Sequence, residues 1–180
     1  MSGKSSLIVA ALSILGILSG SAQAAGQDRW LVMVYVAADN DMEPQLVDDV
    51  LEMARANAGP NVEILVQMDR RRGWNGTPED EEVGIPGVLA YVAGIRRFRI
   101  VGNRADGVVN PGAGDSGNPS QLQGFINLAL DNASTDFRGS TVRHALVMIG
   151  PGAGWRGALQ DDSTRSSTAM TAAQMAAAIH

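Results

Sequence analysis

The sequence predicts an α/β domain with a mainly parallel sheet flanked by helices. Short apolar runs rich in β-forming residues alternate along the chain with segments in which apolar residues recur at helical spacing. This alternation is typical of parallel strands joined by helical crossovers. Polar or glycine-rich turns follow several of the apolar runs, and in such sheets functional sites gather outside the carboxyl ends of the strands. We therefore expect one domain with a site at one edge of its sheet.

Residues 1–24 have the layout of a secretory signal peptide: a polar start, an almost wholly apolar stretch at residues 7–18 and a small-residue cleavage site ending at Ala24. A membrane anchor is the alternative, but a spanning helix needs about 20 apolar residues. Serine and glycine cut this run short. We therefore expect cleavage near Ala24, export to the periplasm or the extracellular space, no membrane contact afterwards, and a domain at residues 25–180.

The composition of the chain argues against a nucleic-acid partner. The formal net charge is −5 and the pI is near 4.9, whereas nucleic-acid binding needs a surplus of lysine and arginine on one face. The chain contains no cysteine. It therefore has no disulfide, no thiolate zinc ligand and no cysteine nucleophile of its own.

The first elements form a predicted βαβ unit. Residues 30–38 are apolar throughout, which indicates a parallel strand buried on both faces. A helix follows, with Asp41 as its expected N-cap and Pro44 in its first turn. Residues 62–68 form the next strand, expected to be parallel to the first through a right-handed crossover. The apolar face of the helix consists of Leu46, Val47, Val50, Leu51 and Ala54.

The middle of the chain is less regular. Residues 69–94 are rich in glycine, proline and acids and are expected to be a long surface excursion, with an edge hairpin around residues 88–92. Residues 96–101 alternate charged and apolar side chains, as in a half-exposed strand, and residues 105–119 are expected to be a loop. Ser120 should open the next helix. The inner face of that helix is predicted to be Leu122, Phe125, Ile126, Ala129 and Leu130.

The last third contains a strand, a glycine-rich turn and a short helix. Residues 144–149 are expected to be a buried strand that ends in the turn at residues 150–155. Thr171 and Gln174 have the spacing of a capping box, which predicts a helix to the end of the sequence. The turns after the parallel strands should share one sheet edge. The candidate binding residues there are Asp39, Asn40, Asp41, Asp69, Arg70, Gly152, Gly154 and Trp155.

Nucleotide binding ranks last among the possible functions. Residues 112–117 spell a G-x-G-x-x-G motif, but the dinucleotide fingerprint needs a strand directly before it and a helix opening inside it. This run is expected to lie in a loop between Pro111 and Pro119 instead. The glycine turn at residues 150–154 does follow a strand, but it lacks the lysine of a phosphate-binding loop.

Metal and histidine chemistry are also weakly indicated. Residues 39–43 carry alternating acids, and calcium favours such oxygen ligands, but the calcium-loop pattern fails at Pro44 and Val50. Helix capping explains the acids, so no metal or other cofactor is predicted, with calcium kept as the alternative. His144 begins the last strand, far from the glycine turn at its other end, and is expected to lie on the surface.

Several blocks resemble the clostripain family of caspase-like cysteine peptidases. They are W-L-V-M-V-Y-V-A-A-D-N-D-M-E at residues 30–43, V-Q-M-D-R at residues 66–70, and A-L-V-M-I-G-P-G-A-G-W at residues 145–155. They occur in the family's order, and the resemblance extends over residues 30–180. In that family an Asp-His-Gly loop follows the strand, and its histidine pairs with a cysteine after the next strand to form a catalytic dyad.

The resemblance implies a caspase-like fold, incomplete at its C-terminus, that acts on peptides or proteins. It also implies that Trp155 packs beneath the loop. The family's Asp-His-Gly falls on residues 150–152, so the histidine position is Pro151, and the cysteine would lie beyond His180. No catalytic residue is therefore assigned. Two functions remain open: an exported cysteine endopeptidase that is inactive as written, truncated or damaged, and a secreted, non-catalytic peptide- or protein-binding module on the same fold.

Overall fold

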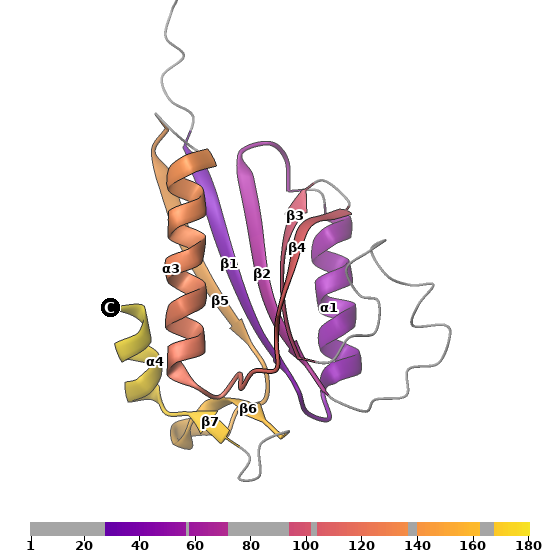
Figure 1. Cartoon of the computed structure of the whole chain (residues 1–180), viewed down its shortest axis with the longest axis vertical. Coiled ribbons are helices and arrows are strands. Elements are labelled where there is room, and N and C mark those ends of the chain that lie inside the picture. Colours follow the sequence, from indigo (N-terminus) through magenta and orange to yellow (C-terminus); the bar gives the residue numbers. More distant parts are fainter. Residues whose placement is uncertain (1–27, 57, 72–93, 102–103, 137–139, 163–167) are drawn as a thin grey trace, which may run out of the picture.

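The structure, a computed structural model, describes residues 28–56, 58–71, 94–101, 104–136, 140–162 and 168–180. It consists of a five-stranded sheet in the order β4-β3-β2-β1-β5 with helices on both faces (Figure 1). The strands of this sheet are β1 (Arg29–Ala38), β2 (Val62–Arg70), β3 (Gly94–Val101), β4 (Arg104–Gly112) and β5 (Val142–Ile149). Helix α1 (Glu43–Arg55) covers one face, and α3 (Pro119–Asp136) and α4 (Ala172–Ile179) cover the other. The predicted α/β class is confirmed.

The three strands that carry the expected site are parallel. β1 is central and pairs in parallel with both β2 and β5, while β3 and β4 add an antiparallel extension. Ala38 is in register with Arg70, and Val36 is in register with Ile149. The carboxyl ends of β1, β2 and β5 therefore lie at the same edge. A short second sheet of β6 (Ala158–Asp161) and β7 (Thr168–Met170) lies below that edge (Figure 1).

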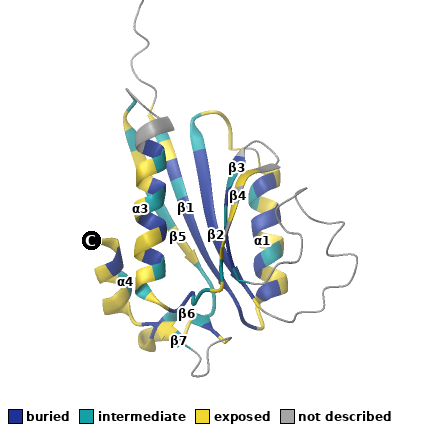
Figure 2. Cartoon of the chain, viewed as in Figure 1, coloured by how far each residue is buried: buried dark blue, intermediate teal, exposed yellow. Residues whose placement is uncertain are grey.

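Alternate residues of β1 and β2 enter two separate cores, because successive side chains of a strand point to opposite faces. The buried core on the α1 side consists of Val34, Val36, Ala38, Leu46, Val50, Leu51, Ala54, Ile64, Val66, Met68, Phe98 and Ile100. The buried core on the α3 side consists of Leu31, Met33, Tyr35, Ala37, Leu65, Leu122, Phe125, Ile126, Ala129, Ala133, Leu159, Met170 and Ala178. Figure 2 shows the resulting burial of most of β1 and β2. The long apolar runs of these strands follow from this two-sided cover.

The expectation of a loop at residues 105–119 is wrong for its first half. β4 occupies this segment and pairs antiparallel with β3, so that Val101 lies opposite Arg104. A strand thus does precede the G-x-G-x-x-G motif, although it is the antiparallel edge strand and not part of a βαβ unit.

The expected starts of two helices are each off by one residue. The N-cap of α1 is Met42, not Asp41, because the side-chain oxygen of Asn40 accepts a hydrogen bond from the Met42 N–H (3.0 Å) and holds the turn. Helix α3 begins at Pro119, one residue before Ser120. The capping box of Thr171 and Gln174 at α4 is present as predicted.

β5 is not the fully buried strand that its apolar run indicates. It is the last strand in the sheet order, and Val147 (41% exposed) and Met148 lie on its surface. In α3, Ala133 takes the buried place expected for Leu130, which is exposed. His144 is exposed near the start of β5, as expected.

Some expectations fall outside the described residues, namely the signal peptide at residues 1–24 and the edge hairpin around residues 88–92. Among the helices that the structure describes, none has the length and apolar character needed to cross a membrane.

Candidate functional site

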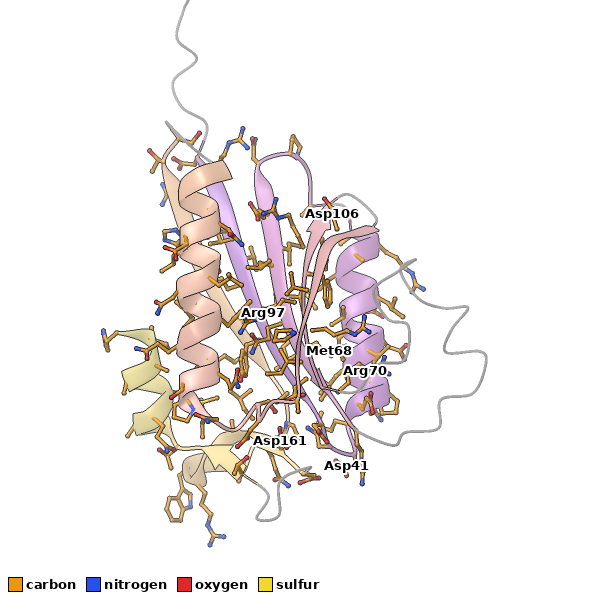
Figure 3. The ribbon with its side chains drawn as sticks, in the orientation of Figure 1. Asp41, Met68, Arg70, Arg97, Asp106 and Asp161 are labelled. Carbon is orange, nitrogen blue, oxygen red and sulfur yellow. The ribbon has the colours of Figure 1, made fainter. Side chains whose placement is uncertain are left out.

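The segments predicted to share one sheet edge do meet there. The Asp162 N–H donates a hydrogen bond to the carbonyl of Asp39 (2.8 Å), just after β1. The side-chain amide of Asn40 donates to the carbonyls of Ala37 (2.7 Å) and Gln160 (3.0 Å). These bonds attach the end of β1 to β6, which follows the glycine turn. Figure 3 shows Asp41 and Asp161 at this end of the molecule.

Three carboxylates converge at this edge and form what we call the acidic cluster: Asp39, Asp69 and Asp161. Each offers an oxygen atom, and these atoms lie within 4.8 Å of one another. All three residues are buried, with exposed fractions of 3%, 2% and 0%. They come from the ends of three strands, β1, β2 and β6, so tertiary packing brings them together.

Strand alternation explains why Asp69 enters the cluster. Leu65 of β2 belongs to the α3-side core, and Asp69, four residues later, points to the same side. The segment before α3 closes over this side, where the Ser116 N–H and hydroxyl both donate to Asp161 Oδ2 (2.8 and 3.2 Å). The Tyr35 hydroxyl donates to the Ser116 carbonyl (3.1 Å). Asp69 is thus enclosed among polar groups at the end of the sheet.

Electrostatics in the cluster are unfavourable to negative charge. Burial is the main cause that raises the pKa of Asp69 to about 8, and the negative charges of Asp161 and Asp39 add to it. The Ser116 N–H, which donates to Asp161 Oδ2, lowers the pKa of Asp69. Burial likewise raises the pKa of Tyr35 well above its usual range, with the nearby carboxylates contributing.

The next residue of β2, Arg70, points to the opposite side and pairs with an acid of α1. Arg70 Nε lies 2.6 Å from Glu43 Oε1, and both side chains are buried. Burial raises the pKa of Glu43 above its ordinary value, and the hydrogen bond and charge of Arg70 offset this increase only in part. Burial and the charge of Arg70 lower the pKa of the neighbouring Arg96. Arg70 therefore ties the start of α1 to the end of β2.

The glycine turn after β5 folds back on itself. The Pro151 carbonyl accepts a hydrogen bond from the Leu159 N–H (2.9 Å), and the Ala153 N–H donates to the Gly157 carbonyl (2.8 Å). Gly150 lies against β1, since a Cβ atom there would stand 2.9 Å from the Cβ of Ala37. The turn is therefore a closed loop whose tip is the short 3₁₀ helix η1 (Gly154–Arg156).

Trp155, at the tip of this loop, is 88% exposed, so the expectation that it packs beneath the loop is wrong. The Arg156 guanidinium carbon lies 5.4 Å from the centre of its ring. The loop is closed by its own backbone hydrogen bonds. The indole is instead presented to solvent.

The structure thus divides the predicted binding residues into two sets. Asp41, Gly152, Gly154 and Trp155 are exposed, whereas Asp39, Asn40, Asp69 and Arg70 are buried. Sequence reasoning missed Asp161 and Ser116. Asp161 follows the glycine turn in a polar stretch, and Ser116 lies inside the G-x-G-x-x-G spelling, which drew attention only to its glycines.

In the part of the chain that the structure describes, this edge brings together carboxylates, hydroxyls and backbone amides but no pair of thiol and imidazole. The chain has no thiol, and His144 lies near the amino end of β5, away from the turn. Pro151 stands where the resemblance expects a histidine. The arrangement can hold a polar ligand or an ion, but it does not contain the parts of a Cys/His dyad.

Comparison with known proteins supports the fold. No protein-family model matches the sequence, and no curated protein matches it. Among solved structures, a secreted C11 cysteine protease from Bacteroides thetaiotaomicron, in complex with an irreversible peptide inhibitor, is similar with a TM-score of 0.56 and 16% identity. The likeness covers 84% of this chain and 39% of that protein. A cysteine protease from B. fragilis gives a TM-score of 0.49 at 18% identity, covering 71% of this chain and 92% of that one. The chain therefore has the caspase-like fold of the C11, or clostripain-type, cysteine proteases, and it spans 39% of the length of the first of them.

Proposed function

We propose that this chain is the N-terminal part of an exported clostripain-type peptidase domain, and that it does not hydrolyse peptide bonds with its own residues. The observation that carries this proposal is the residue in the turn after β5. This turn lies at the carboxyl edge, beside the end of β1, where the resemblance expects a histidine, and the residue there is Pro151. A proline side chain has no ionisable group, so it cannot serve as a general base.

The missing thiol points the same way. In a cysteine peptidase the thiolate attacks the peptide carbonyl, and an imidazole nearby supplies or stabilises that thiolate. The chain contains no cysteine, so the two halves of the dyad cannot both come from it. The C11 protease with a similar fold is more than twice as long, which supports the assignment of this chain to part of such a domain.

Export rests on two supports. Residues 1–24 have the layout of a signal peptide, and the C11 protease with a similar fold is described as secreted. N-terminal sequencing of the protein recovered from the periplasm or medium of an expressing bacterium tests this part. A first residue near position 25 is expected, and an intact Met1 on protein retained inside the cell would contradict it.

Activity is tested on the purified full chain with fluorogenic peptides that end in arginine or lysine, since the family tends to cut after basic residues. We expect no turnover above buffer and no covalent mass gain from an irreversible thiol-directed peptide inhibitor. The matched control is Pro151→His, which supplies the imidazole but no thiol and should stay equally inactive. Turnover that follows the wild-type protein through purification would refute the proposal.

The gene itself gives a companion test. Resequencing of codons 140–180 and the bases that follow should again give Gly150 and Pro151. A reading of Asp-His at these codons, in a frame that continues to a cysteine after another strand, would identify a working peptidase instead.

The alternative is a non-catalytic peptide-binding module, which two surface features favour. β5 is the last strand of the sheet, and an edge strand can pair with an extended peptide through its backbone groups. The exposed indole of Trp155 lies in the loop that follows this strand. Peptide binding should change the tryptophan fluorescence of the chain, and Trp155→Ala should remove most of that change. Calorimetric titration that finds no binding to the folded chain by any peptide of a mixed library would exclude this function.

A further inference from the structure

The segment of β4 at Asp106 and Gly107 is an exposed feature that the proposed function does not use. Asp106 lies opposite Arg99 of β3, and the register of the ladder shifts between this pair and the next one. Such a shift is typical of a β-bulge, in which an extra residue of one strand is left out of the regular pairing. Gly107 has a φ of 63°, a backbone conformation that glycine adopts readily. Gly107 thus lies where the pairing of β4 with β3 is interrupted.

The side chain of Asp106 turns back onto the backbone. Its Oδ1 atom accepts a hydrogen bond from the Gly107 N–H (2.8 Å). Both residues are exposed, and β4 is the first strand in the sheet order, so water reaches this group from the free edge of the sheet. A Cβ atom at Gly107 would meet nothing within 4 Å. The carboxyl group is therefore held against the next amide nitrogen with open space around both.

A carboxyl group and the following amide nitrogen can react with each other. The nitrogen attacks the carboxyl carbon Cγ and forms a bond to it, and the amide proton and the carboxyl hydroxyl leave together as one water molecule. The product is a five-membered succinimide ring. Water then adds to either ring carbonyl: addition at Cγ restores aspartate, whereas addition at the main-chain carbonyl breaks its bond to nitrogen and leaves isoaspartate. Water is the only co-reactant in this sequence.

We propose that Asp106 is a site of self-modification, where the folded protein converts aspartate to isoaspartate through a succinimide with the Gly107 nitrogen. The hydrogen bond holds the two reacting groups together, which removes much of the entropic cost of their encounter. Glycine has no side chain to hinder the approach, and it permits the backbone rotations that ring closure needs. The inference concerns β4 alone and does not depend on the proposed function.

Asp115 is in the opposite situation and serves as the comparison within the same chain. Its Oδ1 atom accepts a hydrogen bond from the Gly117 N–H (2.9 Å), two residues further on. The nitrogen that would have to attack this carboxyl group is that of Ser116, and its N–H donates to Asp161 Oδ2 (2.8 Å) in a buried position. The fold should therefore protect Asp115 from this reaction and leave Asp106 reactive.

The modified chain should stay folded, so that the product accumulates. Isoaspartate lengthens the backbone by one carbon atom and moves the free carboxylate to Cα. β4 already contains a bulge at this point and has a neighbouring strand on one side only, and edge strands tolerate such irregularities.

The test incubates the purified full chain in H₂¹⁸O at neutral pH, either folded or unfolded in guanidinium chloride. Each passage through the ring replaces one carboxyl oxygen by an oxygen of water, so the product carries one ¹⁸O atom. The tryptic peptide at residues 105–138 contains both Asp106 and Asp115, and its fragmentation by electron transfer locates the label and distinguishes isoaspartate from aspartate. In the folded chain, label should enter Asp106 about tenfold faster than Asp115, because misplaced groups react that much more slowly. Unfolding should speed up labelling at Asp115 but not at Asp106.

Two variants connect the reaction to this contact. Asp106→Glu keeps a negative charge opposite Arg99 but cannot close a five-membered ring, so this position should take up no label. Gly107→Ala should slow the labelling of Asp106 by about tenfold, because its Cβ atom crowds the nitrogen and disfavours the positive φ. Circular dichroism should show both variants folded, since both positions are exposed.

A wild-type chain that takes up label at Asp106 only when unfolded would overturn the proposal. Equal labelling of Asp106 and Asp115 in the folded chain would overturn it as well, because the reaction would then not depend on the contact between Asp106 and Gly107.

Discussion

The buried ion pair between Glu43 and Arg70 should contribute little net stability, yet breaking it from one side should be costly. The two side chains meet at 2.6 Å with exposed fractions of 1% and 7%. Burial is the largest influence on Glu43 and raises its pKa despite the hydrogen bond and charge of Arg70. Desolvation therefore outweighs attraction at this carboxylate. In Arg70→Met the carboxylate loses its partner and takes up a proton.

The pH dependence of this variant follows from that proton. A carboxyl held neutral in the folded state, with an ordinary pKa of 4.5 in the unfolded chain, destabilises the fold increasingly as pH rises above 4.5. Each unit amounts to about 1.36 kcal/mol, so the cost of this proton is at most about 3.4 kcal/mol at pH 7 and about 0.7 kcal/mol at pH 5. In Glu43→Met no carboxyl remains to take up this proton, so the cost of removing the buried partner of Arg70, about 3 kcal/mol, should not change between these pH values.

Urea unfolding of four proteins measures these differences: wild type, Arg70→Met, Glu43→Met and the double variant. The double variant removes both charges and fills the space with methionine, so it should lie within about 1.5 kcal/mol of wild type. A cost of Arg70→Met that is equal at pH 5 and pH 7 would refute the role assigned to Glu43. If the loss of unfolding free energy in the double variant equals the sum of the losses in the two single variants, the proposed balance between burial and attraction is refuted.

Three further predictions concern the edge and its loop. In urea unfolding, Gly150→Asp should lower the free energy of unfolding by about 1–3 kcal/mol, because a Cβ atom there would stand 2.9 Å from the Cβ of Ala37. The control Gly152→Asp, which has open space around it, should change this free energy by less than about 0.5 kcal/mol. Equal losses in the two variants would contradict the packing of Gly150 against β1. Tyr35 should resist ionisation in a spectrophotometric titration of a Tyr91→Phe variant, because burial is the main cause that raises its pKa. The free energy of unfolding should fall as pH rises above about 10, where only the unfolded chain loses this proton. A normal titration of the folded protein would contradict the burial of Tyr35. Trp155→Ala should leave the free energy of unfolding within about 0.5 kcal/mol of wild type, since the indole is 88% exposed, and a loss above about 1 kcal/mol would show that it packs against the fold.

The sequence predicts the parts of the fold in which local pattern and tertiary environment agree. β1 is a nearly continuous apolar run and β2 a mostly apolar one, because helices cover both of their faces, and α4 carries its own capping signal in Thr171 and Gln174. β4 escaped prediction because its glycines and proline look like a loop, and an edge strand with irregular register tolerates them. The exposure of β5 depends on its place in the sheet order, which its own residues do not determine.

The candidate site, too, is only partly predictable from the sequence. Parallel strands predict that Asp39 and Asp69 lie at the same edge of the sheet. The structure confirms this position, because β1 and β2 end in register. Their burial was not predictable, since it depends on β6 and on the segment around Ser116 closing over them. Asp161 had no signal of its own. It is an acid in a polar stretch until the fold places it beside Asp39 and Asp69.

Asp69 and Arg70 are adjacent in β2, and the alternation of the strand sends them to environments that should respond in opposite ways to pH. Arg70 faces Glu43, so the cost of Arg70→Met should grow between pH 5 and pH 7, as the carboxyl left without this partner is held neutral. Asp69 faces two further carboxylates, and burial with their charges raises its pKa from the ordinary value of 3.8 to about 8. The proton that Asp69 keeps in the folded state therefore costs stability as pH rises above 3.8, and Asp69→Asn, which needs no proton, should gain stability relative to wild type between pH 5 and pH 7. Opposite trends at the two neighbours would separate their environments from a general effect of pH on an acidic protein, and a stability of Asp69→Asn relative to wild type that is equal at pH 5 and pH 7 would contradict the raised pKa of Asp69.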